Sequence, residues 1–303
     1  MAEARMLFDR ALLRQRRARA ARLGPATFLI DHVAAELAER LLAVTRRFEL
    51  GADVGSPTAA VQRALLASAR VDTLIGAAPQ AQPGRDDGPA VRADEEALPF
   101  RSEALDLVVS ALSLQFVNDL PGTLVQIRRA LKPNGLFLAA LLGANTLTEL
   151  RQAFAAAETE IEGGLSPRVA PFADVRTLGG LVQRAGFALP VADLETLTVR
   201  YDSPLALMQD LRLMGATNVL IERRRTPLRR ATLRCLAARY ADGFADQDRR
   251  VRATFDIVWL SGWAPHESQQ QPLRPGSARA RLADALGATE MSAGEAAPGG
   301  RRR

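Results

Sequence analysis

Two short apolar runs near the middle of the chain show no alternation with polar residues. Leu105–Leu112 and Leu136–Leu142 each have the composition of a strand that is covered on both faces, as in a parallel sheet. Between them, apolar residues three or four positions apart predict a helix that Asn118 or Asp119 caps and that ends at residues 132–135 (Lys-Pro-Asn-Gly). A strand, a helix and a second strand make a parallel crossover, so this stretch predicts an α/β fold.

The hydrophobic pattern predicts further elements on both sides of this unit. Apolar positions at helical spacing indicate helices over residues 28–47, 145–164, 174–187 and 203–215. Strands are expected over residues 48–56, 71–79, 191–203 and 253–265, with the last of them near the edge of the sheet. Residues 77–90 are rich in proline, glycine and glutamine, and we expect them to form a flexible loop.

Composition narrows the class of protein. The 303 residues are 48% hydrophobic and 24% charged, which is ordinary for a soluble globular chain with a sizeable core. No apolar run approaches the length of about eighteen residues that a membrane-spanning helix needs. Cys235 is the single cysteine, which excludes a disulfide framework and a cysteine metal site and fits a reducing, cytoplasmic compartment.

The basic charge of the chain is almost entirely arginine. Its formal net charge is +6, and Lys132 is the single lysine among 40 basic residues. With two Trp and two Tyr there is no stacking platform for bases, so we attribute the charge to composition rather than to nucleic-acid binding. Residues 1–24 predict an amphipathic helix with its arginines in solvent, and contact with a membrane surface or a partner is the alternative. Residues 221–252 carry about six net positive charges and are expected to form an inserted helical pair.

Several segments resemble the class I S-adenosylmethionine-dependent methyltransferase fold, and more narrowly the family of NADH dehydrogenase (complex I) assembly factor 5. The matching motifs are FDR, ADEEALPF, LDLVVSALSLQFVNDLP, LKPNGLFLAALLG, ETEIEGGLSPRVAPF, LMQDLRLMGATN and GWAPHESQ. A more distant likeness is to the methyltransferase of biotin synthesis, which esterifies a malonyl group on its carrier protein. The resemblance covers roughly Phe8–Gly276.

The resemblance implies a Rossmann-like fold with a mostly parallel seven-stranded sheet and helices on both faces. We expect an N-terminal helical extension over residues 1–47 and a methyltransferase-like domain over 48–276. A helical insertion at about 217–252 should precede the last strand. Residues 277–303 should form a tail that is largely disordered from about 287.

The resemblance also implies a site for S-adenosylmethionine at the carboxyl ends of the strands. Asp53 and Gly55 would belong to the glycine-rich turn after the first strand, where a helix N-terminus follows. Asp94 would contact the adenine amino group with its side chain, and Glu95 would contact the ring with its backbone. Ser110, on the strand 105–112, is assigned to the same site.

Two parts of this expected site depart from the family pattern. Pro57 and Ala59 stand where the family usually has a non-proline residue and a second glycine. The acidic residue that normally binds the ribose hydroxyls is replaced by Gly76 or Ala77. We therefore expect S-adenosylmethionine to bind weakly.

Candidate catalytic residues follow the strand that ends near Leu112. Gln115 and Phe116 stand where the assembly-factor family often has His-Trp and the biotin enzymes have Gln-Trp. Methyl transfer to an activated acceptor needs mainly alignment, so the lack of an obvious base does not argue against it. His32 and His266 are the only histidines, and neither belongs to a metal-ligand pattern or a Ser–His–Asp arrangement.

Three functions are compatible with these observations. The first is a methyltransferase-family enzyme that modifies a protein in complex I assembly. The resemblance to mitochondrial members implies that this modification is hydroxylation of an arginine. A hydroxylase would ordinarily need an iron triad, and we find no candidate for one in the sequence. The second is a non-catalytic assembly protein with an eroded cofactor pocket. The third is the malonyl-carrier-protein enzyme, but Gln209 stands where its carboxylate-binding arginine is expected, with Arg212 one turn away.

Overall fold

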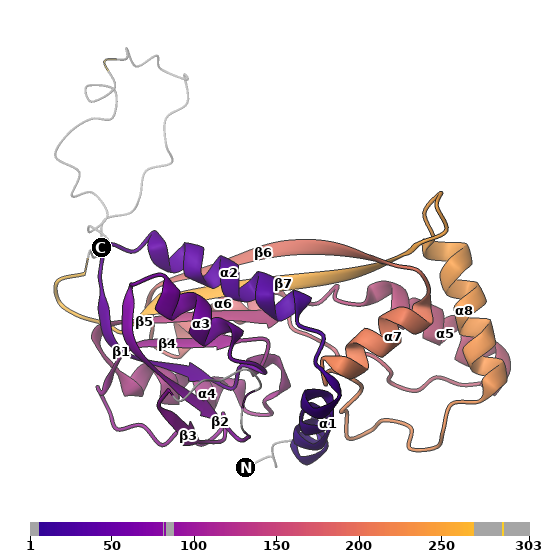
Figure 1. The fold of residues 1–303 in the computed structure, drawn as a ribbon, viewed down its shortest axis with the longest axis horizontal. Coiled ribbons are helices and arrows are strands. Elements are labelled where there is room, and N and C mark those ends of the chain that lie inside the picture. Colours follow the sequence, from indigo (N-terminus) through magenta and orange to yellow (C-terminus); the bar gives the residue numbers. More distant parts are fainter. Residues whose placement is uncertain (1–5, 81, 83–87, 270–286, 288–303) are drawn as a thin grey trace, which may run out of the picture. The chain divides into compact units, whose positions relative to one another are not determined.

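Seven strands form one sheet in the part of the chain that the structure describes (Figure 1). The structure is a computed structural model, and it describes residues 6–80, 82, 88–269 and 287. The strands are β1 (Phe48–Val54), β2 (Val71–Ala78), β3 (Ala90–Arg92), β4 (Leu105–Ala111), β5 (Leu131–Leu142), β6 (Ala188–Tyr201) and β7 (Val251–Trp263), in the order β3-β2-β1-β4-β5-β7-β6. The first five strands run parallel, whereas β7 is antiparallel to both β5 and β6. The expected α/β fold with a mostly parallel seven-stranded sheet is confirmed.

Helices cover both faces of this sheet, and others lie beyond its carboxyl end. In chain order the helices are α1 (Arg10–Leu23), α2 (Phe28–Leu42), α3 (Ala60–Ala67), α4 (Leu120–Ala130), α5 (Thr148–Glu162), α6 (Val175–Arg184), α7 (Pro204–Leu213) and α8 (Arg230–Phe244), with a short 3-10 turn at Leu114–Phe116. On β4, Leu107 and Val109 belong to the apolar cluster that contains α2 and α3. Val108 between them belongs to the cluster on the other face, with α4 and α6. Every residue of β4 is buried, including the polar Asp106 and Ser110, as expected of a strand that is covered on both faces.

The segment before α8 differs from the sequence prediction. We expected a helical pair over residues 221–252, but among the described residues this segment contains the single helix α8. Pro227 lacks a backbone N–H, and Arg223 and Arg224 bind carboxylates of other elements, so residues 221–229 stay irregular. Helix α8 packs on α5, and Cys235 lies partly buried against the core there.

Asp119 rather than Asn118 caps α4. The Asp119 carboxylate accepts a hydrogen bond from the backbone N–H of Gly122 at 2.8 Å. The Asn118 side-chain oxygen instead accepts from the backbone N–H groups of Leu7 and Phe8, both at 2.8 Å. These bonds fix the segment that leads into α1 beside the end of β4.

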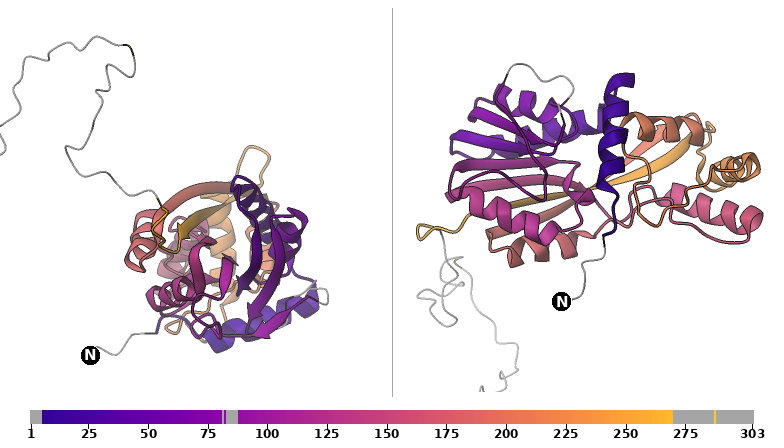
Figure 2. Two further views of the ribbon diagram at one scale, coloured as in Figure 1. Left: turned by 90° about the vertical axis from the view of Figure 1, so that its left-hand side faces the viewer. Right: turned by 90° about the horizontal axis from the view of Figure 1, so that it is seen from below.

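Strands β6 and β7 form a long antiparallel pair, connected through α7 and α8, that reaches from the sheet to the region of α5, α7 and α8 (Figure 1). Helix α1 lies between the carboxyl ends of the parallel strands and α7, as the views from the front and from below both show (Figures 1 and 2). This position of α1 decides the shape of the site described next.

The chain divides at His266 into two units, and only residues 267–269 and 287 of the second unit are described. The expected domain boundary at 276 and most of the expected disordered tail lie outside the described residues. The expected boundary between residues 47 and 48 stays a prediction.

Candidate functional site

A narrow crevice lies where β1 and β2 end, at the edge of the sheet where open α/β sheets bind ligands. We call it the crevice; among the described residues its wall consists of Arg10, Leu13, Arg14, Arg17, Ala18 and Ala21 of α1 together with Gly55, Ser56, Pro57, Ala78, Pro79, Gln80, Gln82 and Glu95. The free volume inside it is about 40 Å³. This is far below the roughly 300 Å³ at which small-molecule sites begin.

The residues predicted from the glycine-rich turn hold the turn itself. Asp53 is fully buried, and its carboxylate accepts hydrogen bonds from the Ser56 hydroxyl and, at 3.4 Å, from the Gln82 amide. Ser110 is also buried and donates to the backbone oxygen of Val54 at 2.6 Å. In this conformation the Asp53 and Ser110 side chains therefore form hydrogen bonds with other residues of the protein.

Gly55 has a left-handed φ of 74° and no room for a side chain. A Cβ at this position would lie 2.5 Å from the Ser113 hydroxyl and 2.7 Å from the Glu95 side chain. The space that a cofactor would use above the turn therefore contains the side chain of Glu95.

Glu95 and Asp94 pair with arginines of α1. The Glu95 side chain is 3% exposed, and its carboxylate accepts from the Arg10 guanidinium and, at 3.1 Å, from the Ser113 hydroxyl. Asp94 accepts from both Arg10 and Arg14. Burial favours a neutral Arg10, but the charges of Glu95 and Asp94 outweigh it and raise the Arg10 pKa above its ordinary value.

Burial also opposes the charge on Asp94, yet the hydrogen bonds from the Glu96 backbone and from Arg10 lower its pKa below the ordinary value. The prediction that α1 exposes its arginines to solvent is therefore wrong for these residues. Arg10, Arg14 and Arg17 follow one another at spacings of four and three positions, which places them on one face of the helix. That face is opposite the two carboxylates that the resemblance assigned to the cofactor. That spacing, together with the acidic turn at 94–96, was the signal available in the sequence.

Arg17 closes the crevice on its inner side. Its guanidinium donates to the backbone oxygens of Leu112 at 3.2 Å and Gly55 at 3.3 Å. Burial lowers the Arg17 pKa, and the Glu95 carboxylate, 3.9 Å away, partly offsets this. Arg17, Ala21 and Pro57 line both the crevice and a second, larger cavity, so they form the wall between the two.

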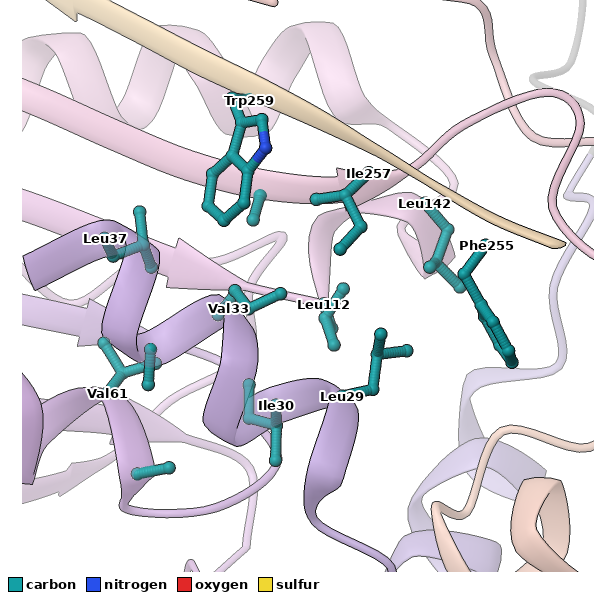
Figure 3. Packing of buried hydrophobic residues seen from close by; sticks show 14 of the residues in the cluster. Leu29, Ile30, Val33, Leu37, Val61, Leu112, Leu142, Phe255, Ile257 and Trp259 are labelled. Carbon is teal, nitrogen blue, oxygen red and sulfur yellow. The ribbon is translucent and has the colours of Figure 1, made fainter. Parts of the chain in front are cut away.

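We call the second cavity the chamber; its volume is about 350 Å³. Its wall is mainly apolar and comes from α1, α2, the ends of β4 and β5, the start of α5, residues 168–172 and α7. Leu29, Leu112 and Leu142 of this wall point toward one another in Figure 3, with Phe255 beside them. The volume lies within the range of small-molecule sites.

The two predicted catalytic residues line the chamber and not the crevice. The side-chain oxygen of Gln115 is buried and has no hydrogen-bond partner among the described residues. Phe116 packs edge-to-face on Phe8 at 5.7 Å and on Phe172 at 6.1 Å. Gln115 is therefore available to a ligand, whereas Phe116 mainly fixes the wall.

Neither residue expected at the ribose position lines the crevice. Gly76 and Ala77 pair with Asp53 and Val54 inside the sheet, and Ala78 is the β2 residue that lines the crevice. Ala59, which stands where the family usually has a second glycine, is completely buried and does not line the crevice, so its methyl group does not narrow it. Asp86 and Asp87, the next carboxylates along the chain, lie outside the described residues.

The remaining candidate residues from the sequence lie partly outside the crevice and the chamber. His32 binds Glu195 at 3.0 Å across α2 and β6. Gln209 is exposed and absent from the chamber wall, whereas Arg212 belongs to it. Within the described part of the chain, no three His, Cys, Asp or Glu side chains gather as metal ligands, and no helix is long and apolar enough to cross a membrane.

S-adenosylmethionine does not fit the crevice in this conformation. The free volume is several times too small, and the obstruction consists of Glu95 and the arginines of α1, which are tied to each other by ion pairs. The fold typically binds this cofactor, but its usual place is filled here by side chains of the chain itself.

Comparison with known proteins places the chain in a family. A family model described as a methyltransferase domain matches residues 48–139. Arginine-hydroxylase NDUFAF5, mitochondrial, of Danio rerio is 37% identical over 286 residues, which are 92% of this chain and 89% of that protein. The protein of the same name from Homo sapiens is 39% identical over 280 residues, or 90% of this chain and 81% of that protein. A malonyl-acyl-carrier-protein O-methyltransferase of Xylella fastidiosa is 37% identical over 172 residues, or 57% of this chain and 56% of that protein.

Two solved structures share the fold at low sequence identity. A putative methyltransferase from Bacillus halodurans is 13% identical and covers 77% of this chain and 99% of its own, with a TM-score of 0.52. The YcgJ protein of Bacillus subtilis is 15% identical and covers 78% and 99%, with a TM-score of 0.51. Since the NDUFAF5 proteins match over most of both lengths, this chain belongs to the NDUFAF5-like family of class I methyltransferase-fold proteins, which is related to malonyl-acyl-carrier-protein O-methyltransferase.

Proposed function

We propose that this protein acts on a protein partner in the assembly of respiratory complex I, and that it does so with the crevice closed and without S-adenosylmethionine as a cofactor. The observation that carries this proposal is the ionic cluster of α1 with Asp94 and Glu95, which leaves about 40 Å³ in the crevice. The role in assembly rests on family membership.

The physical cost of opening the crevice favours a closed working state. Arg10 and Glu95 are 11% and 3% exposed at their side chains, so separating them would leave two charges poorly solvated unless α1 moved as a whole. Phe8 and Leu13 anchor α1 in an apolar cluster with Phe116, Val219 and Leu220. A cofactor would have to displace both kinds of contact.

A pair of alanines on α1 offers a matched test. Ala18 lines the crevice, whereas Ala11 is exposed on the same helix. Ala18→Phe fills the remaining space, and Ala11→Phe adds the same ring in solvent. In a host that lacks its own copy of the gene, both variants should restore complex I assembly as wild type does.

The opposite result is equally clear. If Ala18→Phe folds normally but fails to restore assembly while Ala11→Phe succeeds, the crevice is used and the proposal is wrong. Circular dichroism and thermal unfolding of the purified variants establish that each of them folds.

A second function is modification of the partner protein, and the observation that favours it is Gln115. Its unpaired side-chain oxygen, buried in the chamber wall beyond β4, is suited to orient an N–H group of an acceptor. Relatives named arginine hydroxylases make an arginine side chain one such acceptor. Mass spectrometry of complex I subunits from cells carrying Gln115→Leu or wild type tests this, since loss of a mass increment in the variant would support modification.

A further inference from the structure

The wall of the chamber contains basic residues as well as apolar ones. Three arginines, Arg17, Arg168 and Arg212, line it, and none of the described residues in its wall is acidic. Two of them are balanced from outside the chamber: Arg168 pairs with the buried Glu158, and Arg17 lies 3.9 Å from Glu95. Arg212 forms no ion pair within the described part of the chain, and it is exposed, which places it at the rim.

We propose that the chamber binds a single-chain amphiphile with an anionic head, of the fatty-acid class, with the alkyl chain inside and the head at Arg212. The apolar wall of Leu29, Leu112, Leu142 and Phe255 excludes water from the chain. The unbalanced guanidinium of Arg212 supplies the charge and the paired N–H donors that a carboxylate or phosphate accepts. A volume of about 350 Å³ accommodates one alkyl chain rather than a bulky two-chain lipid.

The same electrostatics disfavour an amphiphile with a cationic head. Such a head at the rim would meet Arg212 with no carboxylate in the described wall to offset the repulsion. Head-group charge therefore separates this proposal from simple hydrophobic binding, in which an alkylamine and a fatty acid of equal length would bind equally.

Titration calorimetry of the full chain with laurate and with dodecylammonium, both below their micelle concentrations, makes this comparison. We expect laurate to bind at one site and dodecylammonium to bind at least tenfold more weakly. Decanoate, which is two methylenes shorter, should bind about tenfold more weakly than laurate because burial of each methylene contributes a constant increment. Dodecyl phosphate distinguishes the sources of the ligand: tighter binding than laurate would indicate a single-chain phospholipid, and weaker binding a fatty acid.

Three variants locate the ligand. Met208→Trp fills the chamber from α7, where Met208 is partly buried, and should abolish laurate binding. Arg212→Gln should weaken it about fivefold, because an exposed ion pair contributes modestly. Arg234→Gln makes the same change on the exposed face of α8, away from the chamber, and should leave binding unaltered.

Several results would overturn the proposal: no binding of laurate or dodecyl phosphate, equal or tighter binding of dodecylammonium, or laurate binding that survives Met208→Trp unchanged. Thermal unfolding of each variant without ligand guards against a folding defect. If Met208→Trp does not fold, the comparison of laurate with dodecylammonium and the effect of Arg212→Gln on laurate binding test the proposal without it. None of these results bears on whether the crevice is closed, so this inference and the proposed function can fail separately.

Discussion

At the scale of single residues, the acidic turn at 94–96 shows what a sequence motif does and does not determine. Its residues are indeed at the end of the sheet, where the resemblance to methyltransferases puts them. Their partners could not be predicted, because Arg10 and Arg14 reach Asp94 across 84 and 80 residues of chain. The motif fixes the position of the carboxylates, whereas the placement of α1 decides what they bind.

Replacing Glu95 by glutamine should destabilise the fold by about 1–3 kcal/mol, because the buried Arg10 loses a charged partner. Urea unfolding of Glu95→Gln and wild type measures the difference in the free energy of unfolding. Glu103→Gln, at an exposed position where the structure records no ion pair, is the matched control and should change stability little. Equal stabilities of the Glu95 and Glu103 variants would contradict a buried ion pair at the crevice.

The lowered pKa of Asp94 predicts a loss of stability in acid. A carboxyl whose folded pKa lies below its unfolded value stabilises the fold fully above that value, which is 3.8 here, and less as the pH falls through the folded pKa. Below about pH 3.8, amide exchange in α1 should therefore rise earlier than exchange in β4. Asp94→Asn should show a shallower dependence of unfolding free energy on pH between 4 and 2.5, and an unchanged slope would remove Asp94 from the ionic cluster.

At the scale of elements, the existence of a helix was easier to predict than the direction that it faces. The arginines of α1 were expected in solvent because an amphipathic pattern does not distinguish water from a buried acidic surface. The segment 221–229 was expected to be helical, but two of its arginines bind carboxylates on other elements: Arg223 binds Asp9 at 3.2 Å and Arg224 binds Glu162 at 3.1 Å. In both cases long-range ion pairs, which no local pattern contains, set the outcome.

Charge reversal in this segment should therefore affect stability unevenly. Asp9 caps α1 by accepting from the Leu12 backbone, and this hydrogen bond together with the charge of Arg223 lowers the Asp9 pKa. Arg223→Glu would place a second negative charge beside Asp9 and should cost about 1–2 kcal/mol of stability. Arg225→Glu, at an exposed neighbouring residue whose charge acts on Asp9 more weakly than that of Arg223, should cost less. If thermal unfolding shows the two variants to be alike, the contact between Arg223 and Asp9 does not anchor α1.

At the scale of the whole molecule, the sheet followed from the sequence and the closed crevice did not. Strands such as β4 and β5 can be recognised in the sequence because most of their residues on both faces are apolar. The crossover between them fixes their parallel order. The sequence also showed that the cofactor motifs were degenerate. It pointed to Pro57, Ala59 and the position of Gly76 or Ala77, and of these only Pro57 lines the crevice. The side chains that fill the crevice, Glu95 and the arginines of α1, could not be inferred, because only three-dimensional packing shows which side chains enter a cavity.

This difference leads to a prediction about S-adenosylmethionine. Wild type should show no binding in calorimetric titrations up to about millimolar cofactor, since the crevice is filled. Arg17→Ala combined with Glu95→Ala removes both side chains together and should allow measurable binding. Adding Ala78→Asp supplies a carboxylate for two ribose hydroxyls, each worth roughly 1–1.5 kcal/mol, and should tighten binding about ten- to hundredfold further. Ala59→Gly, at a residue outside the crevice wall, is the control that should have no effect.

Low-micromolar binding of S-adenosylmethionine by wild type that these variants do not improve would mean that α1 readily leaves the crevice. The closed state would then be a resting state of an enzyme rather than the working state of an assembly protein.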